Sequence, residues 1–153
     1  MYRVSDVMTK QVVYLPVETT LDEAARVMRE SDIGDVVVTD GAALAGMLTD
    51  RDIVVRAVAE RADPATTTIG SVITREVVMI EQHCTAGEAV ALMRERNIRR
   101  VLVCDNERKL VGIISLGDLA MQLDERRDPF LTPPAGEVPL ANTSAGRDAT
   151  RRG

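Results

Sequence analysis

The spacing of apolar and polar positions predicts the same series of elements in each half of the chain. Short apolar runs at 11–15 and 77–80 predict a first strand in each half. A stripe of apolar residues with helical spacing follows each run, and it begins at a Thr-x-x-Glu sequence of the capping-box type. These helix starts are Thr20-Leu21-Asp22-Glu23 and Thr85-Ala86-Gly87-Glu88.

Two further strands and a final helix complete the pattern in each half. Continuous apolar runs at 36–38 and 101–103 are typical of strands that are buried on both faces. A polar turn follows each run, and it leads to a third strand and then to a helix. The third strands are predicted at 44–48 and 110–114, and the final helices are predicted to start at Thr49 and Ser115. The order strand-helix-strand-strand-helix predicts a mixed α/β (α+β) fold.

The two halves match each other along most of their length, which indicates an internal duplication. A shift of 65 positions aligns them as far as Asp40 and Asp105, and a shift of 66 aligns them afterwards. Residues 46–53, Gly-Met-Leu-Thr-Asp-Arg-Asp-Ile, thereby match residues 112–119, Gly-Ile-Ile-Ser-Leu-Gly-Asp-Leu. Two copies favour one body with pseudo-twofold symmetry over a solenoid, which usually needs at least three repeats.

Proline positions and composition divide the chain into four segments. We predict a first repeat at 3–60, a linker at 61–68, a second repeat at 69–123 and a tail at 124–153. Pro64 ends any helix that begins near Asp52. The tail has few apolar residues and is expected to be disordered and dispensable for folding. Its pair Phe130-Leu131 leaves a docking role open as an alternative.

Composition and charge narrow the range of functions. The chain is 45% hydrophobic but has no tryptophan and one phenylalanine, so the core must be aliphatic and base stacking is not expected. A net charge of −5 argues against general nucleic-acid binding, which needs clustered lysine and arginine. We find no apolar run of membrane-spanning length and no signal-peptide pattern at the start, and therefore expect a cytoplasmic protein without a membrane partner.

Cysteine and histidine give little support for metal chemistry. His83 is the only histidine, and the two cysteines, Cys84 and Cys104, lack CxxC spacing. A His-Cys dipeptide supplies too few ligands for a zinc site, so no metal site is predicted. Cys104 follows an apolar run and is expected in the core. Cys84 precedes a helix and remains a candidate for a more reactive thiol.

The tandem repeat resembles a known family. A Gly-apolar-x-Thr/Ser-x-x-Asp sequence closes each repeat, and the whole pattern over about residues 3–123 is similar to a pair of cystathionine-β-synthase (CBS) domains, or Bateman module. Residues 32–35, residues 46–54 and the Asp63-Pro64 linker are similar, more narrowly, to stand-alone bacterial CBS-pair proteins of the hypoxic-response type.

The resemblance implies a regulatory protein that binds an adenine nucleotide such as AMP, ADP or ATP, or another adenosyl ligand, between its repeats. It implies an energy or stress sensor rather than an enzyme, with no cofactor. An aspartate carboxylate suits this role because it can accept hydrogen bonds from both ribose hydroxyls. Gly46 or Gly112 is expected to leave room for the ligand to approach the main chain, and the helix start offers free amides to an anion.

By resemblance, two clefts are expected, and the repeats are not equivalent in them. Basic residues that face phosphate in the family stand before strand 101–103 only, whereas the first repeat has Asp35 at the equivalent place, where it would repel a phosphate. The stronger cleft is expected to use Asp118, Ser115, Arg99, Arg100, Thr9, Val12, Val13 and Ile33. The weaker cleft is expected to use Asp52, Thr49, Thr74, Val77, Val78 and Ile98.

Simpler interpretations of these residues remain open. Each Thr/Ser-x-x-Asp pair also fits a helix cap, and the arginines also fit solvated surface charges or a pair with Glu95. Catalysis is not expected, because no nucleophile-base pair, P-loop or metal constellation accompanies Asp50-Arg51-Asp52. The alternative function is a structural or protein-interaction module that binds no ligand.

The final helices are also expected to form a homodimer, because they carry apolar residues on faces that a lone CBS pair would leave in water. These residues are Val54, Val55, Ala57 and Val58 in the first repeat and Leu119, Ala120 and Leu123 in the second.

Overall fold

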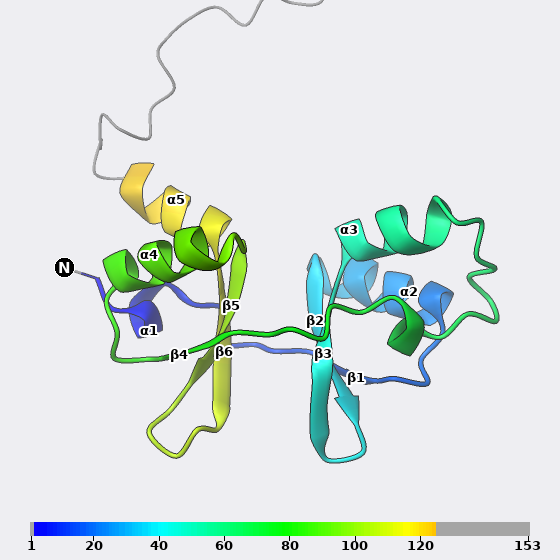
Figure 1. The fold of residues 1–153 in the computed structure, drawn as a ribbon, viewed down its shortest axis with the longest axis horizontal. Helices are drawn as coiled ribbons and strands as arrows, with labels where there is room; N and C mark the ends of the chain where they lie inside the picture. The colour runs from blue at the N-terminus through cyan, green and yellow to red at the C-terminus, as the bar shows by residue number, and fades with distance from the viewer. Residues whose placement is uncertain (1, 125–153) are drawn as a thin grey trace, which may run out of the picture. The chain divides into compact units, whose positions relative to one another are not determined.

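The computed structural model describes residues 2–124, which contain two three-stranded sheets (Figure 1). The chain divides into two compact units. Residues 1–119 form the first unit, which holds both sheets, and the second unit begins at Ala120. The predicted tail, apart from its first residue, lies outside the described residues. None of the helices between residues 2 and 124 is long and apolar enough to span a bilayer.

The first sheet has the strand order β1-β2-β3, with β1 parallel and β3 antiparallel to β2. Helix α2 connects β1 to β2, and a short helix follows β3 and continues as a π-helix. The elements are β1 (Tyr14–Pro16), α2 (Leu21–Ser31), β2 (Asp35–Asp40), β3 (Ala43–Thr49), α3 (Asp50–Asp52) and the π-helix η1 (Ile53–Val58). This is the predicted order of elements.

The second sheet repeats this arrangement with the order β4-β5-β6. Its elements are β4 (Met79–Glu81), α4 (Ala86–Arg96), β5 (Arg100–Cys104), β6 (Leu110–Ser115) and α5 (Leu116–Asp124). Strands β2 and β5 lie at the centre of their sheets, and the valines and leucine at 36–38 and 101–103 are fully buried, as predicted. Cys104 is also buried, as predicted.

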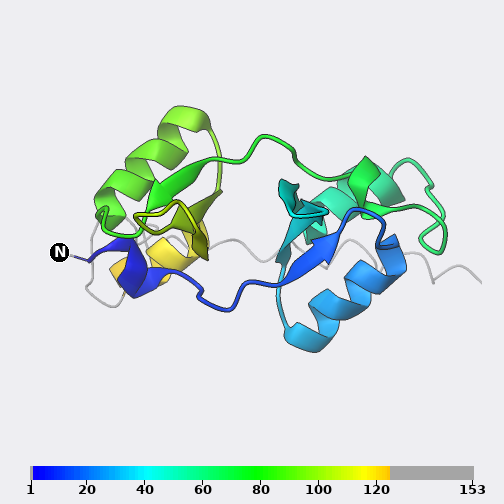
Figure 2. The same ribbon diagram turned by 90° about the horizontal axis from the view of Figure 1, so that it is seen from below.

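The segment before each first strand packs against the other repeat. Helix α1 (Val4–Val7) lies beside α4, and Val4 belongs to the hydrophobic core of the second sheet. The equivalent segment, the 3₁₀ helix η2 (Ile69–Ser71), contributes Ile69 to the core of the first sheet. Figure 2 shows both crossings, as the blue and green segments that run between the two sheets. The crossings bring residues of both repeats together beside β3 and β6.

The first strands begin later than the apolar pattern predicts. The predicted run 11–15 becomes β1 at Tyr14–Pro16, and 77–80 becomes β4 at Met79–Glu81. Val12 and Val77 were predicted in these strands but lie before them, and they pack against a third apolar cluster instead. That cluster joins the two sheets through Val37, Met47, Leu102 and Ile113. Apolar character alone does not distinguish these contacts from strand pairing.

The two predicted capping boxes differ. In α4, the Glu88 N–H donates to Thr85 Oγ1 at 3.1 Å and the Thr85 N–H donates to Glu88 Oε2 at 2.7 Å, as predicted. The box predicted at Thr20 does not form, because the Glu23 N–H donates to Asp22 Oδ1 at 2.9 Å. The Thr20 hydroxyl also donates to this oxygen. This hydrogen bond is the main reason that the pKa of Asp22 lies below its usual value.

Two of the apolar residues that were predicted to be exposed on the final helices are buried. Ala57 and Leu119 are each 1% exposed and face the cores, so their assignment to a free surface is wrong. Val54, Val55 and Val58 remain 59%, 51% and 64% exposed.

Candidate functional site

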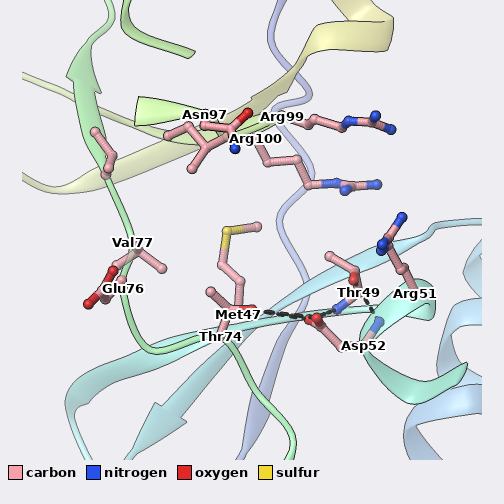
Figure 3. Close-up of a pocket in the computed structure, with 12 residues that line it drawn as sticks. Met47, Thr49, Arg51, Asp52, Thr74, Glu76, Val77, Asn97, Arg99 and Arg100 are labelled. Carbon is pink, nitrogen blue, oxygen red and sulfur yellow. Dashed lines mark hydrogen bonds between the residues drawn. The ribbon is translucent and has the colours of Figure 1, made fainter. Parts of the chain in front are cut away.

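A cavity of about 300 Å³ lies within residues 1–119, between parts of the two repeats (Figure 3). This volume is at the lower end of the range for small-molecule sites. The first repeat contributes the end of β3 and the short helix α3, and the second contributes the segment before β4, the residues before β5 and the first residue of β5. The lining residues are Met47, Thr49, Arg51, Asp52, Thr74, Glu76, Val77, Val78, Asn97, Ile98, Arg99 and Arg100.

Asp52 lies on the cavity wall and also caps the helix to which it belongs. The Thr49 N–H donates to Asp52 Oδ2 at 3.0 Å, and the Asp52 N–H donates to Thr49 Oγ1 at 3.0 Å. The cap uses the oxygen Oδ2. Thr74 Oγ1 lies 3.5 Å from both carboxylate oxygens, and Arg56 Nε lies 3.9 Å from Oδ1. The simpler interpretation of this pair as a helix cap is therefore confirmed, and the cap fixes the carboxylate beside the cavity.

Thr74 reaches Asp52 because two segments of main chain come unusually close. Met47 and Thr74 exchange main-chain hydrogen bonds of 2.9 Å each. A Cβ at Gly46 would overlap the Thr74 carbonyl oxygen, and one at Gly112 would lie 2.8 Å from the Thr9 carbonyl oxygen. The expectation that these glycines leave room for a ligand is therefore wrong, since protein main chain fills that room.

Arg56, which lies on η1, forms hydrogen bonds with the chain segment that leads to Thr74. Its Nη1 donates to the carbonyl oxygens of Val72 at 3.2 Å and Ile73 at 3.0 Å, and its Nε lies 3.9 Å from Asp52 Oδ1. Arg56 thereby links η1, Asp52 and the residues just before Thr74. The equivalent position in the second repeat is Gln122, which has no charge to offer Asp118.

Replacing Arg56 with glutamine, the residue of the second repeat, is expected to lower the free energy of unfolding by about 1–2 kcal/mol. The variant loses charge-assisted hydrogen bonds to two carbonyls, and the effect is moderate because the side chain is 48% exposed. Urea unfolding measures the loss. Arg51→Gln is the control, and a change within about 0.5 kcal/mol is expected there. Equal stabilities of wild type and Arg56→Gln would contradict the linking role.

Arg100 forms an ion pair between the repeats. Its Nε donates to Asp35 Oδ2 at 2.7 Å, with the two side chains 32% and 24% exposed. These residues occupy equivalent positions, 65 apart in the sequence. Asp35 therefore sits opposite a positive charge, which offsets the repulsion of phosphate that the sequence led us to expect from it.

Arg51 and Arg99 complete a cationic side of the cavity. Figure 3 shows the side chains of Arg51, Arg99 and Arg100 on one side and those of Glu76 and Val77 on the other. Among residues 2–124, neither Arg51 nor Arg99 has a carboxylate within ion-pair distance. Met47, Thr74 and Asp52 lie between the two sides (Figure 3).

The structure brings together all six residues of the cleft that was expected to be weaker. Asp52, Thr49, Thr74, Val77, Val78 and Ile98 all line the cavity. Arg99 and Arg100 line it too, although the sequence grouped them with Ser115 and Asp118. Strand pairing places the Arg100 main chain opposite Ser115, but its side chain reaches Asp35 in the other repeat.

The residues of the other predicted cleft are arranged as equivalents of the first set. Ser115 and Asp118 form the same reciprocal cap, at 2.9 and 3.0 Å. Thr9 exchanges main-chain hydrogen bonds with Ile113. Val12, Val13 and Ile33 are partly buried against the apolar clusters.

Four lining residues were absent from the predicted sets, namely Met47, Arg51, Glu76 and Asn97. Arg51 had a detectable signal, since it lies inside the Thr-x-x-Asp sequence of the first repeat. Met47 lies in the matched segment as well, but its apolar character indicated only a strand.

Comparison with known proteins identifies the family. The CBS domain model matches residues 4–58 and 69–125. The chain belongs to the CBS domain family. Its two CBS domains match those of "CBS domain-containing protein YhcV" of Bacillus subtilis, with 38% identity over 121 residues, 79% of this chain and 85% of the relative. Hypoxic response protein 1 of Mycobacterium tuberculosis is also 38% identical over 121 residues, 78% of this chain and 84% of that protein.

Solved structures of CBS proteins share the fold. Hypoxic Response Protein I, solved with two coordinated zinc ions, has a TM-score of 0.64 and 35% identity, covering 80% of this chain and 99% of that chain. The CBS domain pair of protein MJ0100, solved with 5'-methylthioadenosine and S-adenosyl-L-methionine, has a TM-score of 0.71 and 25% identity, covering 81% and 98%. Within residues 2–124 of this CBS pair, no three His, Cys, Asp or Glu side chains are grouped as a metal site requires.

Proposed function

We propose that this CBS pair is a regulatory protein that binds an adenosyl ligand in the cavity beside Asp52. One observation carries the proposal: a carboxylate fixed by its helix cap lies between an apolar wall and a cationic side. An adenine nucleotide has the same order of parts, with an apolar base, a ribose bearing two hydroxyls, and phosphate.

Each part of the cavity suits one part of such a ligand. Val77, Val78 and Ile98 offer apolar contact to the base. The Asp52 carboxylate accepts from the ribose hydroxyls, and the Thr49 and Thr74 hydroxyls lie beside it. Arg51, Arg99 and Arg100 face the third part of the nucleotide, the phosphate. The 5'-methylthioadenosine and S-adenosyl-L-methionine bound by the MJ0100 CBS pair support the adenosyl part of this proposal.

Asp118, Ser115, Thr9, Val12, Val13 and Ile33 stay proposed residues of a second, equivalent site. We propose that this site is the weaker one, because Arg99 and Arg100 line the first cavity and Gln122 replaces Arg56. This reverses the order of strength inferred from the sequence.

Calorimetry with adenosine and AMP tests the proposed function. Both ligands are expected to give saturable heats and to raise the melting temperature, since they bind the folded state. Inosine is the matched control, because it keeps the ribose and changes only the base edge, and it is expected to bind more weakly. The absence of heat and of a thermal shift with every adenosyl compound would instead support the ligand-free interaction module.

The exposed valines of η1 support the homodimer that was expected from the sequence. Val54, Val55 and Val58 are all more than half exposed on one short helix. Light scattering at tens of micromolar is expected to give twice the 16.7 kDa of one chain. Val58→Glu is expected to shift the mass toward that of the monomer, because it places a charge in an apolar contact. Leu44→Glu, at an exposed apolar position on β3, is the control, and a monomeric wild type would contradict the dimer.

The wider role is part of the same proposal. We propose that the protein senses energy or stress state through its ligand, acts in the cytoplasm and has no catalytic activity. The name of Hypoxic response protein 1 supports a link to stress.

A further inference from the structure

A second hollow, a groove on the first repeat, is separate from the Asp52 cavity. Its volume is about 620 Å³, compared with about 300 Å³ for the cavity, and the two share no lining residue. Helix α2, the π-helix η1 and the start of the linker form its walls, all within residues 1–119. The groove is therefore built by the first repeat and the linker alone.

Main-chain hydrogen bonds hold the linker against both helices. At the start of α2, the Asp22 N–H donates to the Pro64 carbonyl oxygen at 3.0 Å. At the end of η1, the Ala62 N–H donates to the Ala57 carbonyl oxygen, also at 3.0 Å. The shape of the groove is thus set by the chain itself, as is usual for binding sites.

The groove offers apolar surface to a partner. Ala25 and Val58 are exposed in it, and Ile53 is partly buried. Exposed apolar surface that is rimmed by polar residues is typical of interaction sites. Val58 also belongs to the valine surface that we assign to the homodimer, whereas Val54 and Val55 do not line the groove.

The charge of the groove is opposite to that of the protein. Arg26, Arg29 and Arg61 line it, together with one carboxylate, Asp22, in a chain with a net charge of −5. Arg26 lies 3.7 Å from Asp22. Arg29 and Arg61 are exposed, and among residues 2–124 no carboxylate lies within ion-pair distance of either. Two cations beside an apolar surface are therefore available to a partner.

These charges disfavour the same groove of a second chain as the occupant. A twofold contact places a surface patch against the same patch of the partner, so arginines would face arginines and repel. An acidic segment that also carries apolar side chains matches both the charge and the apolar surface.

We propose that this groove is a docking site for an acidic segment of a partner protein, bound as an amphipathic helix. Its apolar side chains pack on Ala25 and Ile53, and its carboxylates pair with Arg29 and Arg61. The inference goes beyond the proposed function, because it assigns a surface through which a regulatory protein acts on a target. It does not require the adenosyl ligand.

Fluorescence anisotropy of the full chain with labelled synthetic peptides tests the docking site. The probe has leucines along one face of a helix and glutamates on the flanks. One control peptide has lysine in place of glutamate, and another has alanine in place of leucine. Wild type is expected to bind the acidic probe about tenfold or more tightly than either control peptide. Added salt is expected to weaken this binding, because the ion pairs are exposed.

The double variant Arg29→Glu/Arg61→Glu is expected to weaken binding of the acidic probe by about tenfold or more, because two attractive contacts become repulsive. Arg94→Glu is the matched control, since Arg94 is the equivalent of Arg29 in the second repeat, is exposed on α4 and does not line the groove. Its effect is expected to stay within about twofold. Melting temperatures check that the variants are folded.

Several outcomes would overturn the docking site. These are no binding of the acidic probe, equal binding of the acidic and lysine peptides, or equal losses from the double variant and Arg94→Glu. A changed mass of the double variant in light scattering without peptide would assign the groove to contacts between copies of this chain. Adenosine calorimetry separates this inference from the proposed function, because the double variant is expected to bind adenosine as wild type does. Failure of the proposed function abolishes the adenosine heat and leaves peptide binding intact.

Discussion

Gly46→Ala is expected to lower the free energy of unfolding by about 3 kcal/mol or more and the melting temperature by about 10 °C. The added Cβ would overlap the Thr74 carbonyl oxygen, which is main chain and cannot rotate away. The strand must therefore separate from the Thr74 segment, and the two main-chain hydrogen bonds between Met47 and Thr74 are lost. Thermal and urea unfolding followed by circular dichroism measure the change.

The control for this prediction is Gly87→Ala in α4. A Cβ there would lie 3.8 Å from its nearest neighbour, the Thr85 Oγ1, and alanine favours a helix over glycine. Its stability is expected to stay equal or rise by up to about 1 kcal/mol. A Gly46→Ala variant as stable as wild type would show that the contact between β3 and the Thr74 segment is not formed in solution.

Asp52→Asn is expected to weaken adenosine binding by about one to two decades in Kd. Loss of the charged acceptor of two ribose hydroxyls should cost about 1.5–3 kcal/mol. Asparagine keeps a side-chain oxygen that accepts the Thr49 N–H, so the helix cap is retained and the loss reports on the ligand. Calorimetry with adenosine measures it, and urea unfolding checks that stability is retained.

Asp118→Asn is the matched control, because Asp118 makes the same cap with Ser115. Its effect on adenosine binding is expected to be less than threefold. Equal losses from the two variants would contradict the inequality of the sites, and a larger loss from Asp118→Asn would restore the order that the sequence suggested.

Local patterns were sufficient to predict the architecture. The duplication, the buried strands β2 and β5 and the core position of Cys104 all follow from apolar character and from the match between halves. These features depend on residues close in sequence, or on a repeat that can be compared with itself. The Thr85 cap was predictable for the same reason.

Features that depend on distant partners were not predictable in this way. The chain crossings place Thr74 against Gly46, and no local pattern indicates that a carbonyl fills the space beside that glycine. Thr20 fails to cap because the Asp22 carboxylate accepts the Glu23 N–H in its place, and the sequence pattern of the box does not reveal this competitor. The Arg100–Asp35 pair joins equivalent positions of two repeats, so its charges were visible in the sequence but their contact was not.

A crystal structure of the protein with ADP shows directly whether the Asp52 cavity is the ligand site. We expect ADP in this cavity, with the ribose hydroxyls on the Asp52 carboxylate, adenine against Val77 and Ile98, and phosphate on Arg51 and Arg99. An empty Asp52 cavity in crystals grown with saturating ADP, or ADP bound only beside Asp118, would contradict it.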